Sequence, residues 1–233
     1  MIPKLIHQTS ASKDISFEER QLQKRFRRFL PDWELKLWDD ADNASLILRT
    51  FPAYYSAYNK LRKGVAKADI ARIVYMYVYG GFYFDTDYKL LRSIGDDILR
   101  NTCVLPISRN NDPGSPEFRV CNSVFGSTPN YHFWKDFVCH IFENQDVDLV
   151  DESNIEKITG PEGLTKFYVE NRNRYPEIHL PRRNTFHPLI ILKGLSYEKG
   201  HSSYGAHLCW GSWRTKNLAR KVKTIAVRKI TCF

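Results

Sequence analysis

Residues 65–87 read VAKADIARIVYMYVYGGFYFDTD, and this stretch decides the fold. The apolar residues of 65–79 recur at helical spacing and predict a strong helix. Gly80 and Gly81 end that helix, because glycine tolerates the backbone conformation of a helix C-terminus. The aromatic run 82–84 predicts a strand that leads directly into Asp85 and Asp87.

The segments on either side predict an α/β domain with a parallel sheet. A short apolar run over 4–8 predicts the first strand, 17–30 predicts a helix stopped by Pro31, and the alternating residues 33–38 predict the second strand. Further elements are expected as helices over 41–61, interrupted near Pro52, and 131–142, and as strands over 101–106 and 120–125. No internal repeat or low-complexity linker appears, so we expect one domain.

The two aspartates predict a metal–phosphate site. Asp85 and Asp87 stand two apart, and in an extended chain their carboxylates point the same way. Two negative charges at such a short distance repel each other unless a cation lies between them. A hard divalent ion suits this place, because it binds carboxylate and phosphate oxygens. Asp69 and Arg72 are three apart and share one helix face, which we expect to face this site. The alternative, for an isolated D-x-D, is a solvated turn.

The same stretch resembles glycosyltransferase family 32, the DXD-motif sugar transferases that include Och1-like mannosyltransferases and bacterial capsular and lipopolysaccharide glycosyltransferases. Further matching segments span nearly the whole chain: residues 2–8, 37–40, 121–126, 159–161, 186–188 and 207–213. The resemblance implies a single GT-A domain over 1–213, with a Rossmann-like mixed sheet flanked by helices. Residues 214–233 then form a basic C-terminal tail.

The family's activity is a retaining transfer of a hexose from a nucleotide-sugar, UDP- or GDP-linked, to a hydroxyl. The resemblance implies Mn²⁺ or Mg²⁺ as cofactor. It also implies a glycan or lipid-linked glycan as acceptor, with surface polysaccharide biosynthesis as the expected role. Attack on the same face of the sugar, with the leaving phosphate helping to deprotonate the acceptor, is the mechanism that the resemblance favours.

The resemblance also assigns roles to residues. Asp87 would ligate the metal directly, Asp85 would contact the ribose or the metal through water, and His207 would approach the metal or diphosphate. Asp69 and Arg72 would hold the donor sugar. The remaining assignments are Asn122 near the sugar, Ser212 and Trp213 over the diphosphate, and Ile6, His7 and Gln8 along the nucleotide cleft.

Structural alternatives exist for several of these residues. His7 could cap the end of the first strand, Asn122 could be a turn residue, and His207 could be a core histidine. Thr9 and Ser10 stand where family members often carry an aromatic that stacks on the base, which leaves the nucleotide base open.

The formal net charge of +9 is concentrated at the C-terminus, where eight lysines and arginines follow the last acidic residue, Glu198. Such a tail suits an anionic membrane surface, and no motif supports nucleic acid as a partner. A second basic cluster over 20–28 is interleaved with apolar residues at helical spacing. It fits either a membrane-surface helix or an ordinary helix docked by its apolar stripe.

Five scattered cysteines without a C-x-x-C pair argue against a disulfide framework and against a zinc cluster. No apolar window is long enough to span a bilayer, and the N-terminus lacks a signal-peptide layout. We therefore expect a cytoplasmic enzyme, peripheral at the inner membrane. Two other classes stay open: a phosphatase-type Asp-x-Asp enzyme, and a basic protein that binds anionic surfaces without catalysis.

Overall fold

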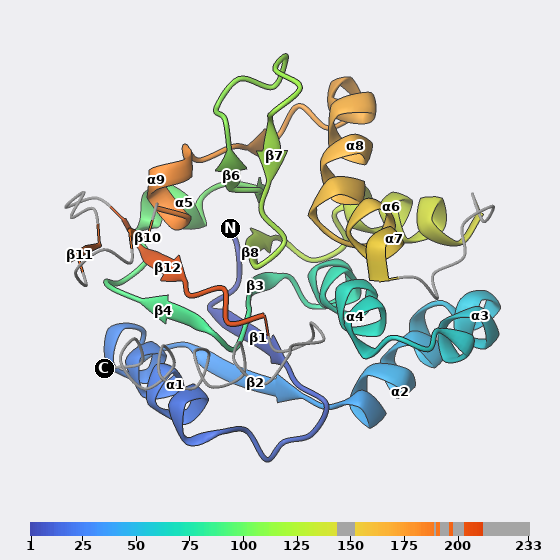
Figure 1. Ribbon diagram of the computed structural model, residues 1–233, viewed down its shortest axis with the longest axis horizontal. Coiled ribbons are helices and arrows are strands. Elements are labelled where there is room, and N and C mark those ends of the chain that lie inside the picture. The colour runs from blue at the N-terminus through green and yellow to red at the C-terminus, as the bar shows by residue number, and fades with distance from the viewer. Residues whose placement is uncertain (144–151, 189, 192–195, 198–202, 212–233) are drawn as a thin grey trace.

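The computed structural model describes residues 1–143, 152–188, 190–191, 196–197 and 203–211 (Figure 1). Its centre is a six-stranded sheet in the order β2-β1-β3-β8-β5-β9. The strands are β1 (Leu5–Thr9), β2 (Glu34–Trp38), β3 (Gly81–Phe84), β5 (Cys103–Val104), β8 (Val124–Ser127) and β9 (Ile178–His179). β1 pairs in parallel with β2 and β3, whereas β8 runs antiparallel between β3 and β5. The sheet is therefore mixed, as in the GT-A fold, rather than purely parallel.

Three two-stranded sheets lie outside this centre. They pair β6 (Ile107–Arg109) with β7 (Arg119–Val120), β12 (Gly205–His207) with β4 (Tyr88–Leu90), and β10 (Ile190–Ile191) with β11 (Ser196–Tyr197). The sequence did not predict β4 or β12, and their pairing brings the C-terminal part of the described chain beside the acidic loop.

Helices connect the strands and surround the sheet (Figure 1). They are α1 (Phe17–Phe29), α2 (Asp40–Thr50), η1 (Pro52–Tyr54), α3 (Tyr55–Lys60), α4 (Gly64–Val78), α5 (Asp96–Leu99), α6 (His132–Glu143), α7 (Glu152–Ile158), α8 (Pro161–Asn171), η2 (Arg172–Arg174) and α9 (Arg183–Phe186). Within the described ranges, we find no helix with the length and apolar character needed to cross a membrane.

Strand β3 is apolar on both faces because each face packs into a separate core. Phe82 and Phe84 join Phe26 of α1 in one cluster, and Tyr83 joins Ile70 of α4 in the other. Since successive side chains of a strand point to opposite faces, this division places helices on both sides of the sheet. A strand covered on both faces reads as a continuous apolar run, as 82–84 does.

Helix α1 is docked by its apolar stripe. Ser16 and Glu19 form a capping box at its start, and Leu22 and Phe26 are fully buried. Arg25 Nε also donates a hydrogen bond of 2.8 Å to the Leu90 carbonyl oxygen. The apolar residues are used within the fold, so the docked-helix alternative holds for this segment.

The two glycines after α4 are required by backbone geometry. Gly80 and Gly81 have φ of 64° and 86°, a region that favours glycine. A Cβ atom on Gly81 would lie 2.4 Å from the Leu5 carbonyl oxygen. This close approach lets β3 pair with β1 and fixes where Asp85 and Asp87 emerge.

The strand expected over 120–125 is wrong in its bounds, because it divides into β7 and β8. Between them, Cys121 N–H donates to the Pro106 carbonyl, and Ser123 accepts a hydrogen bond from Asp85 N–H. Residues 121–123 therefore leave the β7 pairing and cross to the end of β3, which brings Asn122 to the candidate site. The strand over 101–106 is likewise shorter than expected. The helix over 41–61 breaks at Phe51 into α2, η1 and α3, which confirms the interruption predicted near Pro52.

Candidate active site

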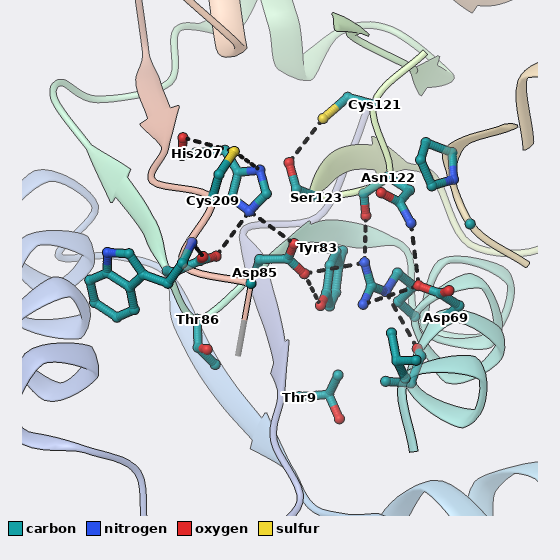
Figure 2. Close-up of a pocket in the computed structure, with 18 of the residues that line it drawn as sticks. Thr9, Asp69, Tyr83, Asp85, Thr86, Cys121, Asn122, Ser123, His207 and Cys209 are labelled. Atoms are coloured by element: carbon teal, nitrogen blue, oxygen red, sulfur yellow. Dashed lines mark hydrogen bonds and ion pairs between the residues drawn. The ribbon is translucent and has the colours of Figure 1, made fainter. Parts of the chain in front are cut away.

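A cavity of 840 Å³ opens where β3 ends, against α4 and residues 121–123 (Figure 2). Its volume falls within the range of small-molecule sites. Six residues expected at the site lie in its wall: Asp69, Arg72, Asp85, Asp87, Asn122 and His207.

His207 joins the two aspartates although about 120 residues separate them. Strand β12 pairs with β4, directly after the acidic loop, and this pairing sets His207 opposite Tyr88. His207 Nε2 lies 3.0 Å from Asp87 Oδ1 and 3.4 Å from Asp85 Oδ2. Burial is the largest single effect and opposes charge on both partners, but their mutual attraction, their hydrogen bond and the contacts with Trp210 N–H and Cys209 together outweigh it. The net effect lowers the pKa of Asp87 and raises the pKa of His207 well above its ordinary value.

The protein holds the other oxygen of each carboxylate. Trp210 N–H donates to Asp87 Oδ2 at 2.8 Å, and the Tyr83 hydroxyl donates to Asp85 Oδ1 at 2.6 Å. One ligand atom each from Asp85, Asp87 and His207 lie within 4.8 Å of one another. Two carboxylates and one imidazole fit a first-row divalent ion such as Mn²⁺, and Mg²⁺ less well because it prefers oxygen ligands throughout.

Arg72 is a buried cation that ties three segments together. Its guanidinium pairs with Asp69 at 3.3 Å and with Asp85 at 3.2 Å, and its side chain is 9 % exposed. Arg72 Nη1 also donates to the Asn122 carbonyl oxygen at 2.7 Å, and the group lies 4.5 Å from the Tyr83 ring centroid. Most of its N–H donors are therefore used within the protein, and they orient Asp69 and Asp85 towards the cavity.

Asp69 is held on both oxygens. The Thr159 hydroxyl donates to Oδ2 at 3.0 Å, and Asn122 Nδ2 donates to Oδ1 at 3.3 Å. Burial raises the pKa of Asp69 to about 6, although the neighbouring Arg72 lowers it in part. A carboxylate fixed in this way in a cavity wall can accept hydrogen bonds from ligand hydroxyls.

The end of β1 differs from expectation. Ile6, His7 and Gln8 are almost fully buried and are not part of the cavity wall. His7 accepts a hydrogen bond from Trp38 Nε1 at Nδ1, and its Nε2 contacts the Gly80 carbonyl oxygen, so it serves the fold. The next three residues, Thr9, Ser10 and Ala11, line the cavity instead. The residues that line the cavity are therefore those directly after the predicted ones, at the end of β1 and in the loop that follows it.

The sequence assigned no site role to the wall residues Cys209 and Glu19, or to Thr159, which contacts Asp69 without being part of the wall. Cys209 and Thr159 were noted only within matching segments. Glu19 accepts a hydrogen bond of 2.7 Å from Thr86 Oγ1, which ties the acidic loop to α1. No local sequence signal predicts the contacts of Thr159 with Asp69 or of Glu19 with Thr86, because the partners are far apart in the chain and meet only in the folded protein. Ser212, Trp213 and the tail 214–233 lie outside the described residues.

One family model matches part of the chain. Residues 16–105 match the model of the glycosyltransferase sugar-binding region containing a DXD motif. This segment contains α1, α4, β3 and the acidic loop, and therefore four of the six wall residues above.

Curated relatives cover nearly all of this chain at low identity. Inositol phosphoceramide mannosyltransferase 2 of Schizosaccharomyces pombe is 24 % identical over 218 residues, which is 93 % of this chain and 59 % of that protein. A mannosyl phosphorylinositol ceramide synthase of Saccharomyces cerevisiae is 28 % identical over 232 residues, which is 100 % of this chain and 58 % of that protein. The chain thus spans somewhat more than half the length of these relatives. A glycosyltransferase of Acanthamoeba polyphaga mimivirus is 26 % identical over 220 residues, which is 91 % of this chain and 84 % of that protein.

Solved structures agree on the fold. The YGT toxin's ligand-free glycosyltransferase domain aligns with a TM-score of 0.56 at 10 % identity, over 97 % of this chain and 89 % of that one. The PaToxG glycosyltransferase aligns with a TM-score of 0.52 at 18 % identity, over 75 % of this chain and 74 % of that one. These likenesses, with the mixed sheet, show the GT-A fold.

Proposed function

Because residues 16–105 match the model of the glycosyltransferase sugar-binding region with a DXD motif, we propose that this chain moves a hexose from a nucleotide-sugar to an acceptor hydroxyl in a metal-dependent, retaining reaction. One observation carries the proposal. Three side chains that can ligate a metal ion and the buried Asp69–Arg72 pair line the same cavity.

Asp85, Asp87 and His207 would hold the divalent cation, with Mn²⁺ favoured by the imidazole. When bound, such an ion neutralises negative charge on a diphosphate leaving group. Asp87 is suited to direct ligation because its pKa is lowered and Trp210 N–H fixes its second oxygen. Asp85 is shared with Arg72 and Tyr83, which suits the expected contact with ribose or with the metal through water.

Asp69 would accept hydrogen bonds from the donor sugar's hydroxyls. Its two oxygens are already oriented by Thr159, Asn122 and Arg72, so little reorganisation is needed when the sugar binds. Arg72 would act mainly by holding Asp69 and Asp85, with a remaining N–H available to the ligand. Ser212 and Trp213 keep their expected role over the diphosphate as part of this proposal.

Retention would follow from attack on the face that the diphosphate leaves. The bond from the anomeric carbon to the phosphate oxygen breaks, and a bond to the acceptor oxygen forms. The acceptor proton passes to the departing diphosphate. The carboxylate of Asp69 is engaged by three protein groups, which favours a binding role over that of a covalent nucleophile.

The relatives suggest which substrates to test first. Two are named as enzymes that mannosylate inositol-phosphate ceramides, so we propose mannose on GDP or another hexose on UDP as donor. The acceptor would be a glycan or a lipid-linked glycan, in surface polysaccharide or glycolipid biosynthesis. The GT-A fold and the family match favour this transferase over the phosphatase-type enzyme and the non-catalytic binding protein.

A peripheral position at an anionic membrane completes the proposal, with a cytoplasmic location as the working assumption. Arg20, Lys24, Arg27 and Arg28 of α1 are exposed, and so is Phe17 at its start, whereas Leu22 and Phe26 are buried. The helix can therefore offer charge to lipid headgroups but no continuous apolar face for insertion. Deletion of 214–233 should weaken binding to vesicles containing anionic lipid, and unchanged binding would remove the tail from this role.

The function is tested by donor hydrolysis with a panel of UDP- and GDP-hexoses, with and without Mn²⁺. We expect Mn²⁺-dependent release of the nucleotide from at least one donor, and Asp87→Asn should abolish it. Asp112→Asn, an exposed loop aspartate, is the matched control and should keep full activity. Equal hydrolysis by wild type and Asp87→Asn would overturn the metal-dependent mechanism.

A further inference from the structure

The ring of His207 lies between two different sets of ligand atoms (Figure 2). On one side Nε2 faces the oxygens of Asp85 and Asp87. On the other side Nδ1 lies 3.3 Å from the sulfur of Cys209. The oxygen side suits a hard cation, and the sulfur side suits a soft one.

His187 completes the sulfur side. Its ring meets that of His207 edge to face, with centroids 5.9 Å apart. One ligand atom each from His187, His207 and Cys209 lie within 4.8 Å of one another. Nδ1 of His187 is buried and has no hydrogen-bond partner in the described part of the chain, whereas the Cys209 side chain is exposed at the cavity wall.

The spacing fits tetrahedral zinc. Zn–N and Zn–S bonds at a tetrahedral angle put the two ligand atoms about 3.5 Å apart. The observed 3.3 Å between His207 Nδ1 and Cys209 Sγ is close to that value. The sequence did not predict this site, because its ligands come from two separate segments and include no C-x-x-C pair. Here the fold supplies two histidines to one cysteine, which leaves the fourth position for water or another ligand.

We propose that His187, His207 Nδ1 and Cys209 form a second cation site, specific for a thiophilic ion such as Zn²⁺, that inhibits the transferase. Binding releases two protons to solvent: the thiol proton of Cys209 as the Zn–S bond forms, and the Nδ1 proton of the His207 ring as the Zn–N bond forms. The lone pair of His207 Nδ1 is then used on zinc, and the remaining ring proton stays on Nε2. That nitrogen can donate to Asp87 but cannot ligate the cation of the acidic pair. The two ions therefore compete for one imidazole, and this regulatory step rests on the proposed function.

Direct metal binding tests the site without any assay of activity. The full chain is titrated with Co²⁺, and the absorption band from thiolate-to-cobalt charge transfer is followed in the near ultraviolet. Wild type and the control Cys139→Ser should develop the band at one equivalent of Co²⁺, and Zn²⁺ should displace it. Cys209→Ser should lose the band, and His187→Asn should weaken Co²⁺ binding about tenfold or more. A band that persists in Cys209→Ser, or its absence in wild type, would overturn the site.

The inhibitory role is tested by measuring the rate of donor hydrolysis with Zn²⁺, divided by the rate without Zn²⁺, at fixed Mn²⁺. In wild type and Cys139→Ser this ratio should be about 0.1 or lower, and extra Mn²⁺ should bring it back towards 1. In Cys209→Ser the ratio should stay close to 1, whatever that variant's own rate. Equal inhibition of both proteins would refute the inhibitory role while hydrolysis itself stands. A cobalt band without any Mn²⁺-dependent hydrolysis would instead refute the proposed function.

Discussion

Arg72 is the residue on which the geometry of the site most depends. It is nearly buried and pairs with Asp69 from its own helix and with Asp85 from the loop after β3. A buried cation with two carboxylate partners is stabilised only while the geometry is maintained, because each group has lost its hydration. Its role is therefore to position the two aspartates as much as to provide charge.

Arg72→Lys should keep the charge and lose the positioning. A lysine ammonium cannot reproduce the planar fork that reaches Asp69, Asp85 and the Asn122 carbonyl together. We expect donor turnover to fall by about 100-fold, the scale of misplacing catalytic groups by about 1 Å. The control is Arg174→Lys, which changes an exposed pair with Asp136 away from the cavity wall and should alter turnover less than threefold. Similar losses in both variants would argue against a special role for Arg72.

Thr159 positions Asp69 through a single hydrogen bond. Thr159→Val preserves the shape and removes the donor to Asp69 Oδ2. Loss of a bond to a buried carboxylate costs about 1–3 kcal/mol, so donor hydrolysis should fall about tenfold or more. Thr102→Val removes a hydroxyl away from the cavity wall and should leave the rate unchanged. If Thr159→Val keeps the wild-type rate, Asp69 does not need this hydroxyl.

At the scale of elements, the helix–glycine–strand unit α4–β3 places the chemistry. Its parts were predictable from sequence because helical spacing, the double glycine and the aromatic run are all local signals. The contribution of β12 was not predictable, since pairing His207 with Tyr88 depends on contacts across more than 100 residues. The burial of Ile6–Gln8 could not be predicted either. A short apolar strand end does not say which of its residues face the core and which face a cavity.

Gly81→Ala should test the glycine turn. The added Cβ would lie 2.4 Å from the Leu5 carbonyl oxygen at a φ of 86°, so β1 and β3 would have to separate. We expect a loss of at least 2 kcal/mol in the free energy of unfolding, measured with urea. Gly64→Ala is the control, because nothing lies within 4 Å of the new Cβ and alanine favours the start of α4. That variant should be as stable as wild type or slightly more so.

At the scale of the whole molecule, the stability of the fold should depend on pH through His7. Burial lowers the pKa of His7 to about 4 from 6.5, and in its neutral form it joins β1 to Trp38 and to the end of α4. In the unfolded chain His7 binds a proton as the pH falls below about 6.5, whereas in the folded chain it stays neutral until the pH approaches 4. Stability from this residue is therefore complete above pH 6.5 and is lost as pH falls towards 4.

His7→Gln should remove that dependence. Wild type should lose about 2 kcal/mol more unfolding free energy between pH 7.5 and pH 5 than the variant does, as measured by urea unfolding at each pH. The variant itself should be less stable at pH 7.5, because a flexible amide replaces a ring stacked beside Tyr75. Parallel pH profiles for the two proteins would contradict a neutral His7 in the fold.

The fold brings the end of the central strand β3, helix α4 and the strand pair β4–β12 together around one cavity. The account stands on the claim that Asp85, Asp87 and His207 bind a cation that in turn binds the diphosphate of an activated sugar. Anomalous diffraction from a crystal grown with Mn²⁺ and a nucleotide-sugar tests this most directly. We expect one manganese peak in contact with Asp87, His207 and the diphosphate. A peak elsewhere, or a bound donor with no manganese between it and these side chains, would contradict the account.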